Sequence, residues 1–349
     1  MDKQKKAVKK GTTKRKLLIA AVVILALLLV LLIAATIIIS GTLGKLTRVD
    51  DLKETMSAEE VQQILNETEP EDENFTGVVL DPNDANLPDG PVALIDSGEN
   101  IVNVLLVGQD TYSKTSRSRT DSMILCTFNR SAKTLTLTSF MRDMYVRIPG
   151  WQSQRLNVAY VYDGFDTLYD TLEYNFGVVV EHGVAVNFAS FKEVIDAVGG
   201  VEVELTGSEA RHLNGQDYSW GLVAGVNHLN GDQALAYSRI RKLDSDFNRT
   251  GRQRAVMMAL FEKAKTLPVT KLMNLIDVLF PMVVTDMSNA EIISLGMELA
   301  PILKDLTMTT QRIPADGEYQ SVMISGMAVL LPDLEANRQI LVDTIGDSK

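Results

Sequence analysis

The chain has few of the residues that build disulfide and zinc frameworks. Among its 349 residues are one cysteine, Cys126, and three histidines. A single cysteine excludes an intramolecular disulfide framework, and the wide spacing of the histidines argues against a zinc site of Cys and His ligands. Basic residues are also outnumbered, because 34 Lys and Arg stand against 45 Asp and Glu for a net charge of −11. Proteins that bind DNA or RNA use a net basic face, so we expect no nucleic acid as a partner.

The first forty residues combine a basic tail with a long apolar run. Residues 1–16 carry eight Lys and Arg and one Asp, a net charge of +7, and the 23 residues 17–39 carry no charge. A helix of that length spans the hydrocarbon core of a membrane. The run is longer than the apolar region of a signal peptide, so we expect an uncleaved, single-pass transmembrane helix, with cleavage near Ala34 or Ser40 as the alternative. The excess of Lys and Arg before this helix predicts a cytoplasmic tail and an extracellular remainder.

Residues 40–98 are predicted to form an acidic extracellular stalk or linker. Positions 50–100 hold 15 acidic residues and one basic residue, and the second half of this segment is rich in Glu, Asp, Asn, Pro and Gly. This composition is typical of a solvated spacer, and an acidic docking surface is the alternative. Ser57, with Glu60 three residues later, predicts a short capped helix over residues 57–66.

The folded domain is predicted to span residues 99–349. Apolar runs of strand length alternate there with segments of helical periodicity. The expected strands are 101–107, 122–128, 134–139, 144–148, 183–187, 201–205 and 306–313. The expected helices are 156–162, 165–176, 188–198, 230–238, 247–266, 271–280, 288–303 and 333–345. This order indicates an α/β domain with a central sheet, mostly antiparallel or mixed, and helices on both of its faces. Cys126 stands within an apolar strand, where we expect it to be buried and unreactive.

Two aspartates stand where a ligand site is expected in such a sheet. Asp110 follows the carboxyl end of the first strand, and Asp121 opens the next one. If the two strands are neighbours, the loop between them brings both carboxylates together. Arg117 and Arg119 precede Asp121 at alternate positions, so in an extended chain they point to the same side. Two carboxylates beside arginines suit a Mg²⁺ ion and the phosphates that it bridges, and a polar loop with surface ion pairs is the alternative. The adjacent pair Arg142-Asp143 follows the third strand, either as a structural ion pair or as a further guanidinium at the same site.

The densest group of basic residues lies at positions 239–254, where five arginines fall within sixteen residues of an acidic protein. Arg239 and Arg241 can serve one ligand only if the preceding helix ends before them and the chain becomes extended. Arg249 and Gln253 are four residues apart and share a helix face. Guanidinium groups match phosphate oxygens in a bidentate manner, so the cluster indicates a di- or polyanionic ligand. A solvated basic helix face is the alternative.

In their order and spacing, these residues resemble the LytR-CpsA-Psr family. The motif-rich part covers about residues 101–258, and the basic tail, single anchor and spacer are similar to the family's layout. The stretches that carry the resemblance are Asp110, Arg119-Thr120-Asp121, Arg142-Asp143, Arg155-Leu156-Asn157, Val186-Asn187-Phe188, residues 196–203, Leu229-Asn230-Gly231, Tyr237-Ser238-Arg239-Ile240-Arg241 and residues 244–254. The sequence departs from the family at Gln109, where a small hydroxyl residue is common, and at Phe140-Met141, where proline commonly precedes the Arg-Asp pair.

The resemblance implies a cell-envelope phosphotransferase. Such an enzyme moves a glycopolymer, for example teichoic acid or a capsular polysaccharide, from a polyprenyl-pyrophosphate carrier to peptidoglycan and forms a phosphodiester bond. The resemblance also implies Mg²⁺ as the cofactor, with Asp110 and Asp121 as ligands. The residues expected to hold the pyrophosphate are Arg117, Arg119, Arg142, Arg239, Arg241, Arg249 and Gln253, and those expected to act in catalysis are Arg119, Arg142, Asp143, Arg239 and Arg241. These roles agree with the chemistry, because phosphoryl transfer depends on positioning and charge neutralisation. Asp143, or a carboxylate that binds the metal, is the candidate acceptor for the proton of the attacking hydroxyl.

Two other functions fit the same residues. The first is a non-catalytic envelope protein that binds polyprenyl phosphate and regulates wall-polymer assembly. The second is hydrolysis of the pyrophosphate as a side activity, since the same arginines would stabilise it.

Overall fold

The structure is a computed structural model of the chain. It describes residues 44, 46–49, 57–66, 75, 77–109, 117–240, 243, 246–268, 271, 280, 283–299, 302 and 305–346. The predicted basic tail and transmembrane helix lie outside these residues. Among the helices that the structure does describe, none has the length and hydropathy of a membrane span. Residues Leu46–Lys349 form one unit by their contacts, and the following paragraphs concern that unit.

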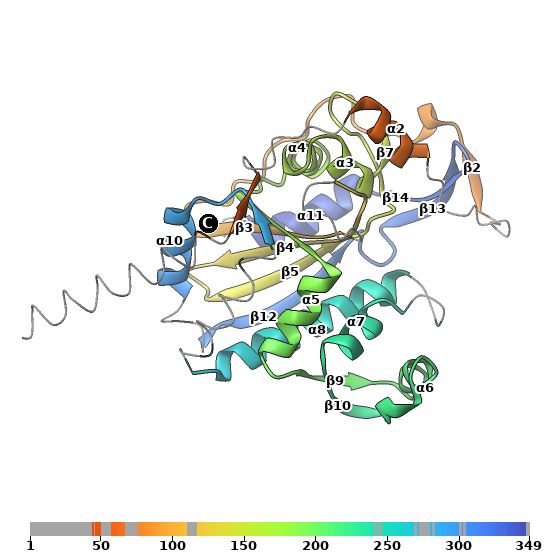
Figure 1. The fold of residues 1–349 in the computed structure, drawn as a ribbon. Coiled ribbons are helices and arrows are strands. Elements are labelled where there is room, and N and C mark those ends of the chain that lie inside the picture. The colour runs from red at the N-terminus through yellow and green to blue at the C-terminus, as the bar shows by residue number, and fades with distance from the viewer. Residues whose placement is uncertain are drawn as a thin grey trace, which may run out of the picture. The chain divides into compact units, whose positions relative to one another are not determined.

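A seven-stranded mixed sheet is the centre of this unit (Figure 1). Its strands, in spatial order, are β1 (Thr47–Arg48), β11 (Val283–Thr285), β8 (His182–Asn187), β3 (Ile101–Gln109), β4 (Thr120–Asn129), β5 (Thr134–Phe140) and β12 (Thr307–Ile313). The pairs β1–β11, β8–β3 and β5–β12 are parallel, and the other three pairs are antiparallel. The mixed sheet predicted from the sequence is therefore confirmed.

The central strand β3 has two apolar faces with different surroundings. Leu105 and Val107 are fully buried and belong to the largest core cluster. Leu106, on the opposite face, is only half-buried because it lines a cavity. Side chains alternate between the faces of a strand, so one nearly continuous apolar run supplies both a packed core and a cavity wall.

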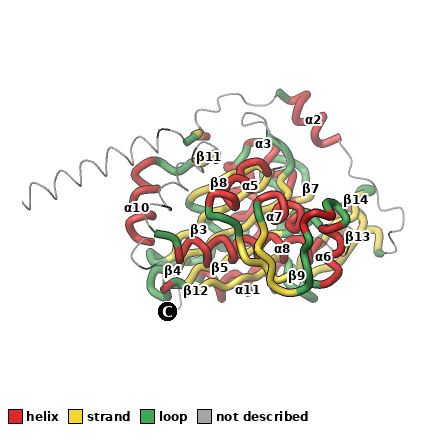
Figure 2. Tube along the Cα trace, turned by 60° about the horizontal axis from the view of Figure 1, so that its bottom comes forward, coloured by secondary structure: helices red, strands yellow, loops and turns green. Residues whose placement is uncertain are grey.

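Helices cover the sheet on both faces (Figure 1). On one face lie α3 (Ala159–Asp163), α4 (Phe165–Phe176) and α11 (Leu334–Ile345), whose apolar side chains join the core cluster of β3, β4 and β5. On the other face lie α5 (Phe188–Ala197), α7 (Gly231–Ser238) and α8 (Asp246–Thr266). In the turned view these three helices lie in front of the sheet (Figure 2). A second apolar cluster joins them to β9 (Val201–Leu205).

Several strands and one helix were not expected from the sequence. β9 pairs in antiparallel fashion with the unexpected β10 (Gly225–Leu229), and the unexpected α6 (Gly207–Asn214) stands between them in the chain. Of two further small sheets, one consists of the unexpected β14 (Met327–Pro332), β13 (Tyr319–Ile324) and β2 (Val78–Leu80), and the other pairs β6 (Tyr145–Val146), within the predicted strand 144–148, with the unexpected β7 (Gln154–Arg155). The described elements also include the predicted helices α2 (Ala58–Asn66) and α10 (Asn289–Leu299) and three 3-10 turns at Pro82–Asp84, Leu156–Val158 and Tyr218–Trp220.

Part of the predicted linker contacts the folded unit. β2, at residues 78–80, pairs in parallel with β13. Ile95 belongs to the main core cluster, and its N–H donates to the carbonyl of Gly177 at 2.8 Å. These contacts hold residues 78–98 against a domain that was expected to begin at residue 99.

Local end signals account for the helices whose bounds the sequence predicted best. Helix α4 spans the predicted residues and ends at Gly177, which adopts the left-handed conformation with φ of 72°. Helix α2 begins with the predicted capping box, in which Ser57 and Glu60 exchange hydrogen bonds of 2.8 and 3.2 Å. Of the strand predicted at 144–148, only Tyr145–Val146 belong to β6, and Met144 forms an isolated bridge with Leu330. Helix α10 is described to Leu299, and Ile302, within the predicted helix, lies in a turn. Most of the predicted helix at 271–280 lies outside the described residues.

Candidate functional site

A buried ion pair marks the end of strands β4 and β5. An Arg142 Nη1 proton is donated to Asp121 Oδ1 at 2.9 Å, and the two side chains are 9% and 16% exposed. Met123 pairs with Phe140 in the antiparallel register, so continuing the register by two residues sets Asp121 opposite Arg142. Their proximity thus follows from strand pairing, and the structure brings these two predicted site residues together.

Asp143 lies between two guanidinium groups. Its carboxylate is 3.4 Å from Arg142 Nε and 3.7 Å from Arg155 Nε. Arg155 also donates to the carbonyl of Ala328 at 2.8 Å, which ties β7 to β14. Arg155 belongs to one of the stretches that carry the family resemblance, but it had no predicted role. Its contact with Asp143 adds it to the site.

Arg117 and Arg119 contact two different helices. Arg117 Nη1 is 3.1 Å from Asp163 Oδ1, at the end of α3. Arg119 Nη2 donates to the carbonyls of Ile64 and Leu65 at 2.9 and 3.3 Å, in the last turn of α2. Carbonyls at a helix C-terminus carry partial negative charge and attract cations. The contacts of these two arginines therefore extend the site region to α3 and α2.

Helix α7 ends before Arg239, as is required if Arg239 and Arg241 are to bind one ligand. Its last residue is Ser238, and Arg239 takes the C-cap position with φ of −103° and ψ of 3°. Arg239 lines an apolar cavity together with Ser238 and Gln253. Arg241 lies outside the described residues, so its predicted place beside Arg239 stays a prediction.

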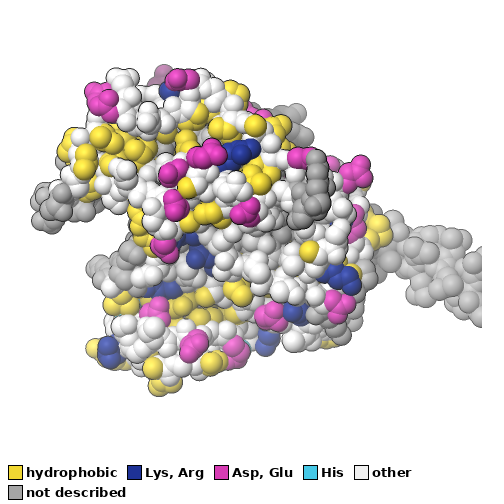
Figure 3. Space-filling view, turned by 180° about the vertical axis from the view of Figure 1, so that it is seen from behind, with side chains coloured by type: hydrophobic (Ala, Val, Ile, Leu, Met, Phe, Trp, Pro, Cys, Tyr) yellow, Lys and Arg dark blue, Asp and Glu magenta, His cyan; other side chains and the backbone are white. Residues whose placement is uncertain are grey.

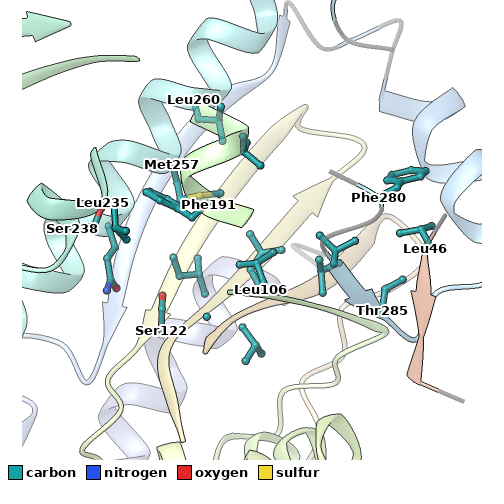
Figure 4. A pocket seen from close by; sticks show the side chains of 18 of the residues that line it. Leu46, Leu106, Ser122, Phe191, Leu235, Ser238, Met257, Leu260, Phe280 and Thr285 are labelled. Atoms are coloured by element: carbon teal, nitrogen blue, oxygen red, sulfur yellow. The ribbon is translucent and has the colours of Figure 1, made fainter. Parts of the chain in front are cut away.

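The cavity has a volume of about 420 Å³ and lies between the sheet and the helices α5, α7 and α8 (Figure 4). Its floor is one face of three paired strands, because Leu106 pairs with Ile124 and Val184, and Gly108 with Ser122 and Val186. The other labelled lining residues are Leu46, Phe191, Leu235, Met257, Leu260, Phe280 and Thr285. Ser122, Ser238, Arg239 and Gln253 are polar lining residues. The cavity therefore suits a ligand with an apolar body and a polar or anionic end.

Helix α8 carries the remaining predicted groups. Arg249 is 1% exposed and is the largest fully buried side chain among the described residues. Gln253, one turn later, faces the cavity. Between them, Thr250 Oγ1 contacts Met141 Sδ at 3.6 Å, so this turn of α8 lies against the residue that precedes Arg142. The helix thereby brings its Arg249–Gln253 stretch to the end of β5.

A second buried ion pair anchors α8. Arg252 Nε is 2.8 Å from Glu209 Oε1, and the side chains are 3% and 12% exposed. Arg252 Nη1 also donates to the carbonyl of Ile240 at 2.9 Å, so it fixes the chain just after Arg239. Burial would raise the pKa of Glu209, but hydrogen bonds from Arg252 and Thr206 outweigh it and lower that pKa. The Thr206–Glu209 capping box is a sequence signal that could have located this acid.

Two further oxygen donors belong to residues near Asp121 in the chain or the sheet. Gln109 pairs with Thr120 across β3 and β4, and the Gln109 Oε1 and Thr120 Oγ1 atoms are buried without a hydrogen-bond partner in the part of the chain that the structure describes. Like a carboxylate, these atoms are hard oxygen donors of the kind that Mg²⁺ prefers. Asp110 lies outside the described residues, and the described residues contain no group of three Asp, Glu, His or Cys side chains that could hold a metal.

Charged side chains gather around a hollow on the face seen from behind (Figure 3). Lys and Arg side chains are recessed within the hollow, and Asp and Glu side chains lie close by. Burial raises the pKa of Tyr160, in α3, to about 12, although Arg117 and a hydrogen bond with Gln109 act to lower it. Tyr160 is therefore a neutral hydroxyl at physiological pH.

With the fold and the site in view, the chain can be compared with known protein families. The LytR_cpsA_psr family matches residues 52–341. The chain belongs to this family, as its sequence motifs predicted.

Among the curated relatives are two teichoic acid transferases. The polyisoprenyl-teichoic acid–peptidoglycan teichoic acid transferase TagT of Bacillus subtilis (strain 168) is 35% identical over 178 residues, which are 49% of this chain and 55% of that protein. The transferase TagU of Enterococcus faecalis (strain ATCC 700802 / V583), which has the same descriptive name, is 39% identical over 171 residues, 47% of this chain and 54% of that protein. The chain thus spans about half the length of the curated relatives that it matches.

Solved structures share the fold over most of the chain. TagT bound to LIIa-WTA superposes with a TM-score of 0.58 and 28% identity, and the match covers 73% of this chain and 92% of that chain. The family protein YwtF (TagT) with bound octaprenyl pyrophosphate lipid gives a TM-score of 0.52 at 26% identity, covering 72% and 93% of the two chains. These likenesses confirm a mixed α/β fold with a central mixed sheet.

Proposed function

We propose that this chain is a phosphotransferase that moves a glycopolymer, such as teichoic acid, from a polyprenyl-pyrophosphate carrier to peptidoglycan. The observation that carries the proposal is the apolar cavity of about 420 Å³ with Arg239 and Gln253 in its lining. An isoprenoid chain needs an apolar cavity, and its pyrophosphate needs cationic donors. The relative that was solved with octaprenyl pyrophosphate lipid supports this class of ligand.

The reaction joins an acceptor hydroxyl oxygen of peptidoglycan to the phosphorus next to the polymer. The bond from that phosphorus to the bridging oxygen breaks, polyprenyl phosphate leaves with the electron pair, and the hydroxyl proton passes to a base. Such a transfer is accelerated mainly by alignment of the groups and by neutralisation of charge on the phosphoryl oxygens.

The chain offers buried cations for this neutralisation. Arg142 is held by Asp121 and Asp143, and Arg249 is almost fully buried on α8. Arginines fixed in this way need no rearrangement as charge develops, and they act more strongly where water is excluded. We assign Arg119, Arg142, Arg239, Arg241 and Arg249, with Gln253 and Arg117, to the pyrophosphate. We assign Asp143 to the hydroxyl proton, because its position between Arg142 and Arg155 fixes its orientation.

A magnesium ion is part of the proposal. Asp110 and Asp121 would hold it, and the unpartnered oxygen atoms of Gln109 and Thr120, the residues that precede these two aspartates, fit its preference for hard donors. When bound, the ion would supply positive charge to the phosphate oxygens.

We further propose that the chain is a single-pass membrane protein with a cytoplasmic N-terminus and an extracellular catalytic domain. The net charge of +7 over residues 1–16 and the uncharged residues 17–39 support this topology. A tether would raise the local concentration of the domain near a carrier lipid in the same membrane.

The test uses the purified full-length protein in detergent, with Mg²⁺, a polyprenyl-pyrophosphate-linked sugar and peptidoglycan fragments. Wild type is expected to form the phosphodiester product, whereas Arg142→Gln and Arg241→Ala are expected to lose at least a hundredfold in rate, since one charge-stabilising donor is worth about 10²–10³. Arg130→Gln is the matched control, because Arg130 pairs with Glu298 on the surface. Equal rates in all four proteins would refute the proposal.

The same assay separates the second candidate function. A regulatory binding protein would retain the lipid tightly and form no product. Release of polymer phosphate without coupling to the acceptor would instead show pyrophosphate hydrolysis.

A further inference from the structure

One face of helix α8 is not used by the site described above. Phe247, Gly251 and Arg254 stand at positions i, i+4 and i+7 of α8, so they share a face. This face is distinct from the one on which Gln253 lines the cavity. At its middle, Thr250 contacts Met141 next to the site arginine Arg142, so the two faces adjoin.

Arg254 extends back along its own helix toward Gly251. Its Nη2 atom is 4.0 Å from the position that a Cβ on Gly251 would occupy, and apart from the adjoining backbone of α8 no other atom of the described residues lies within 4 Å of that position. Helical side chains commonly lean toward the N-terminus in this way. The missing side chain at Gly251 therefore leaves open space beside a guanidinium group.

A second arginine reaches the same turn from the sheet. The guanidinium of Arg312, in β12, lies over the Phe247 ring at 4.3 Å from its centroid. Arg312 also donates from Nε to the carbonyl of Pro314 at 3.2 Å and contacts the exposed carboxylate of Asp316. Two guanidinium groups thus lie against the stretch of α8 from Phe247 to Gly251.

No buried acid among the residues that the structure describes balances these two cations. Arg254 Nη1 is buried and has no hydrogen-bond partner among the residues that the structure describes. Burial and the positive charge of Arg312 both lower the pKa of Arg254. Asp316, the carboxylate that contacts Arg312, is 93% exposed, where solvent screens its charge. Two like charges against one turn of a helix, with room for a further group beside Gly251, favour a bound anion.

We propose that Gly251, Arg254 and Arg312 form a second phosphate subsite, which binds a phosphodiester of the glycopolymer while the carrier pyrophosphate occupies the first site. The inference rests on the proposed function, because that function supplies a polymer which, in the teichoic acid class, repeats a phosphodiester along its chain. Guanidinium pairs bind such groups through parallel N–H donors. The subsite would select polyanionic polymers over neutral ones.

The test is a binding titration that needs no turnover. Full-length protein in detergent is titrated with synthetic tri(glycerol phosphate) and, separately, with inorganic pyrophosphate at one ionic strength. Arg254→Gln and Arg312→Gln are each expected to weaken tri(glycerol phosphate) binding about tenfold or more, the loss of one charge-assisted contact. Both should bind pyrophosphate within twofold of wild type. Arg254→Lys keeps the charge without the planar fork and should recover part of the affinity.

Two further variants control for misfolding and for general charge. Gly251→Asp places a carboxylate in the open space and should abolish tri(glycerol phosphate) binding without lowering the unfolding midpoint. Arg211→Gln removes an arginine on α6 and should change neither affinity. The inference is overturned if wild type does not bind tri(glycerol phosphate), if the glutamine variants bind it as wild type does, or if they lose pyrophosphate equally. A failed transfer assay with this binding pattern intact would refute the proposed function alone.

Discussion

The buried ion pair between Glu209 and Arg252 should contribute far more to stability than a surface pair of nearly the same length. Its Nε–Oε1 distance is 2.8 Å with side chains 12% and 3% exposed. The pair of Arg130 and Glu298 has an Nε–Oε2 distance of 2.7 Å, but these side chains are 36% and 38% exposed. The chain thus offers two matched pairs that differ mainly in burial.

The perturbation is Glu209→Gln, compared with Glu298→Gln. Removing one partner of a buried pair leaves an uncompensated charge and costs about 3–5 kcal/mol. The exposed pair is worth about 0–1 kcal/mol. Glu209 also accepts from the Thr206 N–H at 2.8 Å, and a glutamine can accept the same hydrogen bond through Oε1, so Glu209→Gln reports mainly on the ion pair.

The assay is urea-induced unfolding of the full-length protein, with a double-mutant cycle that adds Arg252→Met. The cycle should return a coupling energy of several kcal/mol for the Glu209–Arg252 pair and less than about 1 kcal/mol for an equivalent cycle at Arg130 and Glu298. Coupling energies that are equal for the two pairs would refute the argument that burial sets their strength.

The pH dependence gives a second readout for Glu209. Its pKa is lower in the folded state than its ordinary value, so its stabilising contribution is present above the unfolded pKa of about 4.3. The contribution is lost as the pH falls through the lower, folded pKa. The stability gap between wild type and Glu209→Gln should therefore shrink only under acidic conditions, and a gap that instead closes near neutral pH would contradict this assignment.

Three other predictions address the cavity, the thiol and the N-terminal helix. Ile124→Trp fills the cavity floor and should weaken binding of octaprenyl pyrophosphate at least tenfold, whereas Val226→Trp on the exposed face of β10 should not; a titration with the lipid checks both, and equal affinities would exclude the cavity as the lipid site. Cys126 is half-buried, not fully buried as expected from the sequence, and burial of its thiol raises the pKa to about 12, so at pH 8 its alkylation by iodoacetamide should be roughly a thousandfold slower in the folded chain than in urea. A similar rate in both states would show that the thiol is accessible. Ser57→Ala removes a helix cap worth about 1 kcal/mol and should raise amide exchange in α2 about fivefold, with no effect on amides of α4; unchanged exchange in α2 would mean that the capping box does not stabilise it.

Local signals in the sequence predict most of the fold. The helix α4 is bounded by Gly164 and Gly177, and both residues have positive φ in the structure. The Val201–Leu205 strand alternates apolar and acidic residues, and its observed burial alternates in the same way. Where a segment carries its own periodicity and its own end signals, no distant contact is needed to place it.

The elements that were missed depend on partners far away in the sequence. Residues 78–80 are three apolar residues in an acidic segment, and they become strand β2 only because β13 pairs with them from residues 322–324. Strand β10, which pairs with β9, contains Gly225 and Asn227, and these residue types are uncommon in strands. Tertiary contacts therefore override weak local preference in both cases.

The sequence predicts which residues belong to the site but not which of them contact one another. The sequence placed Asp121 and Arg142 near the ends of two strands, and the register of β4 and β5 then decided that they form an ion pair. No sequence feature indicated that Arg119 binds the end of α2 or that Arg155 contacts Asp143. These contacts join residues 12, 21 and 55 positions apart in the chain, and only folding brings them together.

Strand β3 has a consequence for how a carrier lipid and the domain would depend on each other. Leu106 and its neighbours Ile124 and Val184 form an apolar surface that no side chain of the described residues fills completely. A lipid tail in that space would serve as a removable part of the hydrophobic interior, and its binding would stabilise the folded state by mass action. The domain would then be more stable with the lipid bound, at the start of each turnover, than after the lipid has left. The release of spent carrier would be opposed by the cost of reopening the cavity. Folding stability and the catalytic cycle would be linked through a single face of one strand.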